Sequence, residues 1–406
     1  MKHVAIVGGG LAGLTCAFYL KRRGMEATVF ESSPKAGGRD TAALYLLAPD
    51  LFRDTFQLIR NVDLAGDVIS ISPQAGQAYR GGVYHHRVAS ATGLLAFKGL
   101  GFADKALLPR MAYLLRRYSA HLDFHHPERG LEFDDETVAS FIKRELSQNV
   151  LNYVAGPLIS SLFYFGSEET SRWLYLVLAK HMFNTRMSTL RGGIRRLSTR
   201  LMERSLTLIN EAVRSIEANE AGYLVNGRPF SDVVVAIPGD QILQVSGIEK
   251  LLSADDRQFF QECTYQRTVS VTVSTEKPVD GNCYAVSIPR VEGYSAAAIS
   301  FLDYIDPSSV SNGRGLVTIT GGGPDVTSAE LLKDLGKLYR IETGEIDVVE
   351  WASGMPKFPP GRYRQIHDFG QRARKPGLFF CGDYLLGPCI EGAVSTGFRA
   401  AEAIQS

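Results

Sequence analysis

The sequence lacks long apolar runs, a cysteine framework and an excess of charge of either sign. No stretch reaches the roughly 18 unbroken apolar residues of a membrane-spanning helix, and the nearest, residues 151–165, is interrupted by Asn152, Pro157 and two serines. The apolar stretch from Val4 to Val7 runs into three glycines, where an export signal would continue. We therefore expect no spanning segment, and a strand near the N-terminus.

Metal cages, disulfide frameworks and nucleic-acid binding are also disfavoured. The five cysteines show no Cys-x-x-Cys spacing and are odd in number. The net charge is +1, and no run of Lys and Arg interleaved with aromatic residues offers a track for a phosphate backbone. We expect no metal site, no nucleic-acid partner and a reducing, cytoplasmic setting.

What the chain does contain is a dinucleotide-binding pattern at its start. A β-run at 4–7 leads through a glycine turn into an apolar helical pattern at 11–21, and a second β-run at 27–30 ends at Glu31. The turn fills Gly-x-Gly-x-x-Gly, so a pyrophosphate would meet the helix N-terminus, and Glu31 would bind ribose hydroxyls. The predicted contacts in this unit are Gly8, Gly10, Leu11, Ala12, Gly13 and Glu31.

Helical periodicity dominates the middle of the chain, and strand patterns return after it. Residues 52–204 read as a mostly helical insertion, and strand runs follow between 206 and 237. Alternating runs between 268 and 319 predict a second, antiparallel sheet. Another buried strand at 378–381 and a closing helix from about 392 to 404 end the chain.

The glycine motif alone leaves NAD and FAD open, and the residues after Glu31 decide between them. Gly37-Gly38-Arg39 resembles the second signature of the flavoprotein superfamily of monoamine and polyamine oxidases, protoporphyrinogen oxidases and phytoene desaturases. The resemblance implies FAD as the cofactor. It also places Arg39 at the FAD pyrophosphate, a role suited to a fixed cation with forked donors.

Other segments along the chain resemble the same family. Gly192-Gly193-Ile194 resembles its Gly-Gly-Met element, residues 210–216 resemble the strand whose valine meets adenine, and 232–238 resemble its Asp-x-Val-Val-x-Ala-x-Pro strand. Residues 379–401 are similar to its closing FAD motif, whose aspartate binds the ribityl and pyrophosphate side and whose last helix points amides at the flavin's pyrimidine edge. The resemblance thus predicts further cofactor contacts at Gly38, Arg39, Val213, Gly382, Asp383, Glu391, Gly392 and Ala393.

The resemblance also predicts the architecture. We expect an α/β fold whose FAD-binding Rossmann-like domain, of glutathione-reductase type, is built from the discontinuous segments 1–75, 190–245 and 370–406. An α+β substrate domain, formed by the helical insertion and the antiparallel sheet, then comprises 76–189 and 246–369.

The substrate side is less defined. Residues 351–358 resemble a segment of protoporphyrinogen oxidases that lies near the flavin, and we expect Met355, Tyr384 and Cys389 to line the cavity. The segment 40–45 departs from the family by leading almost at once to the next helix, so the wall of the cavity is rebuilt or shortened. No catalytic base is assigned, because hydride transfer to flavin can proceed by positioning and desolvation alone.

Two further features have ordinary interpretations. The pairs His85-His86 and His125-His126 are interpreted as surface-loop residues, because adjacent strand histidines point to opposite faces and no acidic partner recurs at ligand spacing. Basic residues among leucines at 105–117 predict a helix that packs on the core or lies peripherally on a membrane.

The sequence therefore predicts an FAD-dependent oxidoreductase that removes a hydride from a C–C or C–N site of a largely apolar small molecule. Oxygen or another acceptor would reoxidise the flavin. An isoprenoid- or tetrapyrrole-like substrate is favoured, and requires a long apolar tunnel; the alternative, an amine oxidase, requires an aromatic pair or a lysine near the flavin. A flavin-binding protein without turnover and a protein that binds NAD alone are the alternatives of other classes.

Overall fold

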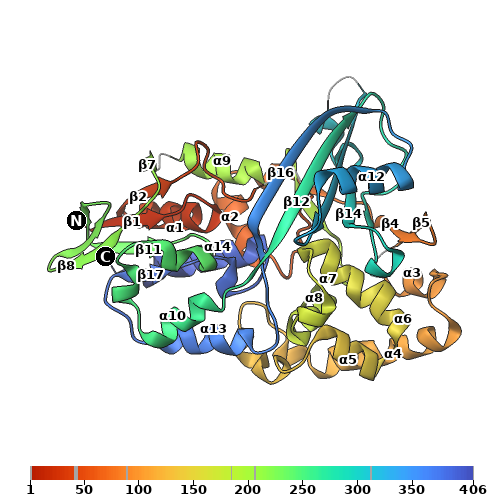
Figure 1. Cartoon of the computed structure of the whole chain (residues 1–406), viewed down its shortest axis with the longest axis horizontal. Coiled ribbons are helices and arrows are strands. Elements are labelled where there is room, and N and C mark those ends of the chain that lie inside the picture. The colour runs from red at the N-terminus through yellow and green to blue at the C-terminus, as the bar shows by residue number, and fades with distance from the viewer. Residues whose placement is uncertain are drawn as a thin grey trace.

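The structure is a computed structural model that describes residues 2–40, 44–87, 90–183, 185–204, 207–310 and 313–405. Its two main sheets stand side by side (Figure 1). The five-stranded sheet fills one end of the molecule, the long strands of a seven-stranded sheet rise from the middle, and helices α3 to α8 lie below the second sheet.

The five-stranded sheet is parallel and is assembled from both ends of the chain. Its order is β17-β11-β1-β2-β7. The strands are β1 (His3–Val7), β2 (Glu26–Glu31), β7 (Thr207–Asn210), β11 (Asp232–Val235) and β17 (Leu378–Phe380). The predicted βαβ unit and the discontinuous Rossmann-like sheet are confirmed; Leu206, predicted to begin a strand, lies outside the described residues.

Helices α1 (Leu11–Arg22) and α14 (Ile390–Ala403) pack together over this sheet and join the two ends of the chain. Their approach is close because a Cβ on Gly397 would lie 2.3 Å from the carbonyl oxygen of Ala12. Val4, Ile6 and Val234 are fully buried beneath them. A strand that is buried on both faces has a continuous run of apolar residues, and this run allowed β1 to be predicted from the sequence.

The seven-stranded sheet carries the order β16-β12-β15-β14-β13-β4-β5. Its strands are β4 (Gln74–Tyr79), β5 (Gly82–Arg87), β12 (Tyr265–Thr275), β13 (Ala285–Ser287), β14 (Ala296–Phe301), β15 (Gly315–Gly322) and β16 (Thr343–Pro356). Neighbours are antiparallel except β13 and β4, which are parallel. Along β12, Val269, Val271 and Val273 alternate into the core.

The region read as mostly helical, residues 52–204, also contributes strands. Besides β4 and β5 it contains β3 (Val68–Ser70) and β6 (Ser188–Leu190), which pair with each other. The buried residues of β4 are small or polar, such as Ala75, Gln77 and Ala78. Such side chains give little strand signal, so this part of the prediction was incomplete.

The remaining helices include those of the predicted helical region, α2 to α9, and four that were not predicted, α10 to α13. They are α2 (Arg53–Asn61), α3 (Ala91–Ala96), α4 (Phe102–Arg117), α5 (Val138–Glu145), α6 (Gln148–Val150), α7 (Gly156–Phe163), α8 (Arg172–Met182), α9 (Arg195–Glu203), α10 (Ala254–Gln261), α11 (Leu302–Ile305), α12 (Ser328–Leu338) and α13 (Arg362–Gln371). A small sheet of β8 (Ile216–Asn219), β9 (Gly222–Val225) and β10 (Arg228–Phe230) flanks the first sheet. Among the described residues no helix has the length and apolarity needed to cross a membrane.

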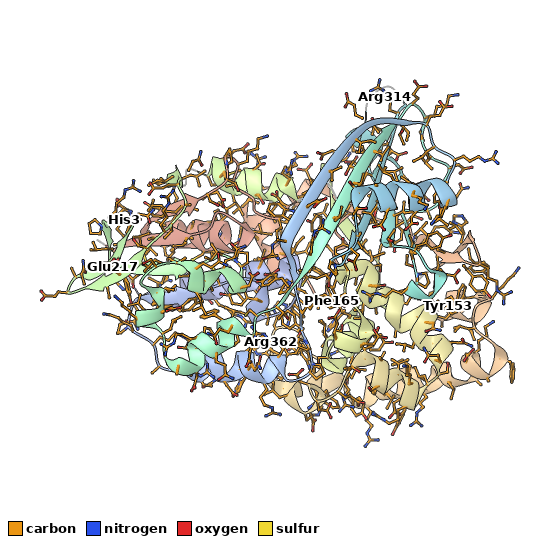
Figure 2. All side chains as sticks on the ribbon, viewed as in Figure 1. His3, Tyr153, Phe165, Glu217, Arg314 and Arg362 are labelled. Carbon is orange, nitrogen blue, oxygen red and sulfur yellow. The ribbon has the colours of Figure 1, made fainter. Side chains whose placement is uncertain are left out.

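The core on one face of the first sheet continues into the helices of the insertion, whereas the seven-stranded sheet has a hydrophobic cluster of its own. Figure 2 marks Phe165 near the centre of the molecule, between the first sheet and the helices around Tyr153, and Phe165 is fully buried. Helices α10 and α13 pack beneath the first sheet, with Phe260 and Phe369 against Phe380 of β17 at 5.1 and 5.8 Å between ring centroids. The predicted ranges place α10 and most of α13 in the substrate domain; that division is retained as a proposal.

Candidate functional site

A cavity of about 790 Å³ is lined by residues from both ends of the chain and from both sheets. This volume lies within the roughly 300–1,000 Å³ of ligand-binding pockets. The predicted cofactor contacts on its wall are Gly8, Gly10, Leu11, Ala12, Glu31, Gly38, Arg39, Val213, Gly382, Asp383 and Ala393. The fold therefore brings together residues that the sequence separates by more than 300 positions.

The glycine turn between β1 and α1 leaves room for a backbone-bound ligand. Gly8 has φ of +110°, and a Cβ there would lie 2.7 Å from the carbonyl oxygen of Ala236. Gly10 and Gly38 face each other, and a Cβ on Gly38 would lie 3.0 Å from the Cα of Gly10. Such a cradle, which side chains would fill, fits the pyrophosphate of FAD above the N-terminus of α1. Gly13 does not line the cavity but packs α1 against β1.

Glu31 ends β2 with its carboxylate held in place. One oxygen accepts a hydrogen bond from the Gly9 amide at 2.8 Å and the other from the Ser33 amide at 2.8 Å. Glu31 is buried and lines the cavity. Because a carboxylate oxygen has more than one lone pair, further acceptor capacity remains for the hydroxyls of a ribose.

Arg39 and Asp383 form an ion pair across the middle of the cavity wall. The Nη2 of Arg39 lies 2.9 Å from both carboxylate oxygens of Asp383, and its Nη1 donates to the carbonyl of Gly354 at 2.6 Å. The Asp383 side chain is only 9 % exposed. The pair ties the segment after β2 to the turn before α14, which fits the predicted binding of both residues to the pyrophosphate and ribityl groups.

The first turn of α14 reaches the cavity through Cys389, Ile390 and Ala393. Gly392 lies behind this wall, where a Cβ would meet the Gly387 carbonyl oxygen at 2.2 Å. Cys389 lines the cavity as predicted, and burial raises the pKa of its thiol to about 12. The thiol is therefore uncharged at neutral pH, which excludes a thiolate nucleophile.

Tyr384, expected among the cavity liners, is placed elsewhere. Its ring is buried and packs against Phe260, with 6.2 Å between ring centroids. The reason is the turn after β17: Gly382 lines the cavity, while the ring of Tyr384 covers Gly382 from the other side at 2.5 Å from its ideal Cβ position.

The opposite wall of the cavity carries aromatic and hydroxyl side chains. Tyr45, Tyr164 and Trp351 contribute aromatic rings, and Met355 lines the wall as predicted. Hydroxyls come from the paired strands β12 and β15, at Thr268, Ser270 and Thr320. Among the described residues that line the cavity, none is a lysine. Of the segment that departs from the family, Asp40, Leu44 and Tyr45 line the cavity, whereas residues 41–43 lie outside the described residues.

Tyr164 is a wall residue that the sequence did not reveal. It follows α7 in the left-handed conformation, with φ of +65°, which is rare for a tyrosine. Burial raises the pKa of its phenol to about 12, so the hydroxyl keeps its proton at neutral pH. The only hint in the sequence was that Tyr164 directly follows the apolar stretch that forms α7 and ends at Phe163.

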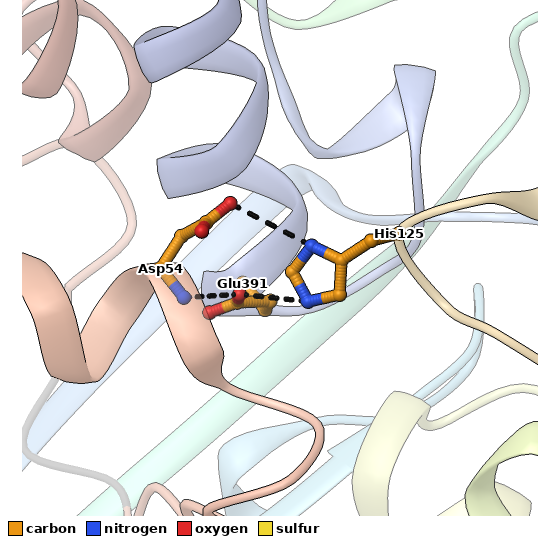
Figure 3. Close-up of side chains that lie close together, drawn as sticks. All are labelled: Asp54, His125 and Glu391. Carbon is orange, nitrogen blue, oxygen red and sulfur yellow. Dashed lines mark hydrogen bonds and ion pairs between the residues drawn. The ribbon is translucent and has the colours of Figure 1, made fainter.

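His125 is not the surface residue that the sequence predicted. It is 7 % exposed, and its Nε2 lies 3.1 Å from Oε1 of Glu391 and its Nδ1 3.6 Å from Oδ2 of Asp54 (Figure 3). These three side chains are close enough to hold a metal ion. The acidic partners come from α2 and α14, far away in sequence, so ligand spacing gave no sign of them.

The geometry of this cluster does not suit a metal ion. The two ring nitrogens of His125 face different carboxylates, whereas a metal ion is bound through one nitrogen. Oxygens of Glu391 already accept from the amides of Asp54 and Thr55 at 2.8 and 2.9 Å and from the Thr55 hydroxyl at 2.6 Å. In the other pair, His85 is exposed on β5, and the side chain of His86 lies outside the described residues.

Comparisons with known proteins match nearly the whole chain to one family. A family model described as flavin containing amine oxidoreductase matches residues 49–405, and one described as NAD(P)-binding Rossmann-like domain matches residues 6–42. The coproporphyrinogen III oxidase of Bacillus subtilis (strain 168) is 22% identical over 469 residues, which cover 98% of this chain and 97% of that protein.

Two solved structures share the fold. The cyclohexylamine oxidase from Brevibacterium oxydans IH-35A has a TM-score of 0.76 and 17% identity, covering 99% of this chain and 98% of its own. An oxidoreductase from Methanosarcina mazei has a TM-score of 0.72 and 17% identity, covering 98% and 100%. At these identities the likeness concerns the fold.

Proposed function

Because the chain belongs to the flavin containing amine oxidoreductase family, we propose that this FAD-dependent oxidoreductase removes a hydride from carbon in a large, apolar, tetrapyrrole-like substrate. The resemblance, the cofactor and the enzyme class predicted from the sequence are confirmed. The observation that carries the substrate proposal is that one continuous cavity of about 790 Å³ joins the glycine turn to a wall of aromatic, apolar and hydroxyl groups. The name of the B. subtilis relative, an oxidase of a porphyrinogen, supports the same substrate class.

Different residues of the cavity would bind different parts of FAD and of the substrate. The glycine turn and Arg39 hold the pyrophosphate, Glu31 the ribose, Val213 the adenine, and Asp383 with the first turn of α14 the flavin side. When bound, FAD supplies the hydride acceptor. Tyr164, Thr268 and Thr320 orient the substrate by neutral hydrogen bonds, and the apolar side chains around them exclude water.

The substrate wall also supports a second candidate. Tyr45 and Tyr164 provide the aromatic set required of an amine oxidase, while Leu162, Phe163 and Met182 provide the apolar surface required of a tunnel. The family name and the shared fold with a cyclohexylamine oxidase are compatible with an amine. An amine oxidase is therefore retained as the alternative, and oxygen or another acceptor as the oxidant.

Anaerobic reduction of the bound FAD separates these candidates. We expect purified protein to show the visible bands of flavin, and a porphyrinogen substrate to bleach them within a single turnover while putrescine and cyclohexylamine do not. Bleaching by the amines alone would replace the proposal by the alternative. Flavin that no substrate reduces, and that no oxidant reoxidises after photoreduction, would identify a flavin-binding protein without turnover.

A peripheral contact with an anionic membrane is proposed for α3 and α4. Phe102 is 91 % exposed and Leu95 55 % exposed. Lys98 is exposed in the segment before α4, Lys105 is half-exposed in the first turn of α4, and Arg116 is exposed in its last turn, whereas the acidic Asp104 is buried and accepts from the Gly101 amide. An exposed phenylalanine on a segment with exposed basic residues suits an anionic lipid surface, where a lipophilic substrate would dissolve.

Removal of the Phe102 ring tests this contact. We expect Phe102→Ser to weaken co-sedimentation with phosphatidylserine vesicles by about tenfold, because burial of such a ring is worth roughly 1.5–3 kcal/mol. Ile346→Ser is the matched control, since Ile346 is 45 % exposed on β16, in the other part of the molecule. Equal loss in both variants, or no binding by the wild type, would contradict the proposal.

A further inference from the structure

The first turn of α14 contains a buried carboxylate beside the cavity. Glu391 is fully buried, and its neighbours Ile390 and Ala393 line the cavity. A helix N-terminus carries roughly half a positive charge, which is smaller than the full negative charge of a carboxylate. Left alone, Glu391 would reverse the field that this turn offers to a bound flavin.

The surroundings of Glu391 supply hydrogen-bond donors from α2 and a close contact with His125. The amides of Asp54 and Thr55 and the Thr55 hydroxyl, all at the start of α2, donate to it. The Nε2 of His125 approaches Oε1 from the other side at 3.1 Å. The N-terminus of α2 and the N–H of His125 thus offset part of the negative charge of the carboxylate. Figure 3 shows Asp54 and His125 on either side of Glu391.

His125 is itself fixed from several directions. Its ring nitrogen Nε2 lies 3.1 Å from the carbonyl of Leu51, and its Nδ1 lies 3.6 Å from Asp54. Its backbone amide donates to Asp123 at 3.0 Å, and its carbonyl accepts from Arg399 of α14 at 2.7 Å. The Ser395 hydroxyl of α14 donates to Asp54 at 2.6 Å. The segment that carries His125 is therefore tied to both α2 and α14.

From this arrangement we propose that His125 is a positioning residue that tunes the bound FAD through Glu391. The Nε2 of His125 lies 3.1 Å from both the Leu51 carbonyl and Oε1 of Glu391, two acceptors, so it carries a proton. This N–H offsets part of the carboxylate's charge and keeps the first turn of α14 able to stabilise negative charge on the flavin. The inference rests on the proposed seat of FAD in the cavity. Removal of the donor strengthens the effective charge of Glu391 and makes the flavin harder to reduce.

The test compares midpoint potentials of bound FAD in three variants and the wild type, measured by equilibration with a reference dye. We expect His125→Phe to lower the potential and Glu391→Gln to raise it, because they strengthen and remove the same negative charge. His125→Gln retains an N–H donor near the position of Nε2 and should stay close to the wild type. His126→Phe is the matched control, since His126 is 48 % exposed and pairs with Glu128 on the surface.

The outcomes separate this inference from the proposed function. Protein that binds no FAD would overturn the proposed function before any potential is measured. Full FAD content with equal potentials in all variants would overturn the inference alone, as would equal shifts in His125→Phe and His126→Phe. One equivalent of metal in the wild type, lost in His125→Gln and Glu391→Gln, would overturn the inference and identify a metal site. Thermal unfolding of each variant identifies any that fails to fold.

Discussion

Gly13→Ala is expected to yield protein that is purified without FAD. The ideal Cβ of Gly13 lies 2.0 Å from the carbonyl oxygen of Gly8 and 3.1 Å from a methyl group of Ile6. The first contact is with backbone, so α1 must move away from β1. That movement disrupts the turn between Gly8 and Gly10, on which the pyrophosphate is proposed to rest.

Gly13→Ala should lower the free energy of unfolding as well as remove the visible bands of flavin. Overpacking of this kind destabilises by about 1–3 kcal/mol, which urea unfolding detects alongside the visible spectrum. Gly336→Ala is the matched control, because Gly336 lies inside α12 and its Cβ would meet nothing within 4 Å. The control should be as stable as the wild type or more stable by up to about 1 kcal/mol. An FAD-loaded Gly13→Ala protein with unchanged stability would contradict the role given to this glycine.

Local signals explain why so much of this half of the site was predictable. The turn from Gly8 to Gly13 requires glycines because backbone segments of one strand–helix unit approach closely there. These residues are close together in the sequence, so the motif could be recognised from the sequence alone. Arg39 and Asp383 were assigned by resemblance, each from a short motif of its own. The sequence did not reveal that they bond to each other at 2.9 Å, because that contact depends on how the two ends of the chain pack.

The parts that escaped prediction depend on distant contacts or on weak local patterns. The bond from the Asp54 amide to Glu391 spans 337 positions, and His125 joins it from a third segment. The His125-His126 pair in the sequence gives no indication of Asp54 or Glu391, because both lie far from it along the chain. Strand β4 was missed because its buried positions include Ala75 and Ala78. Large β-branched or aromatic residues, which mark a strand in the sequence, are absent there. Tyr164 was missed because a left-handed residue after a helix is usually glycine.

Arg39→Ala is expected to weaken FAD binding by about 100-fold or more. The substitution removes a cation proposed to meet the pyrophosphate, and hydrogen bonds to charged groups are worth roughly 1.5–3 kcal/mol. It also leaves Asp383, whose side chain is 9 % exposed, without the partner that lies 2.9 Å away. Fluorescence titration of apoprotein with FAD measures the loss. Arg200→Ala on α9, where the arginine is 38 % exposed and pairs with Glu203, should bind FAD as the wild type does.

A double variant shows which of the two causes dominates. If the unpaired carboxylate of Asp383 repels the pyrophosphate, Arg39→Ala combined with Asp383→Asn should bind FAD more tightly than Arg39→Ala alone, because the buried charge is gone. If direct binding by Arg39 dominates, the second substitution gives no recovery. Arg39→Lys should fall between the wild type and Arg39→Ala, since lysine keeps the charge but loses the forked donors that reach Asp383 and the Gly354 carbonyl together. Wild-type affinity in Arg39→Ala would remove this residue from the cofactor site.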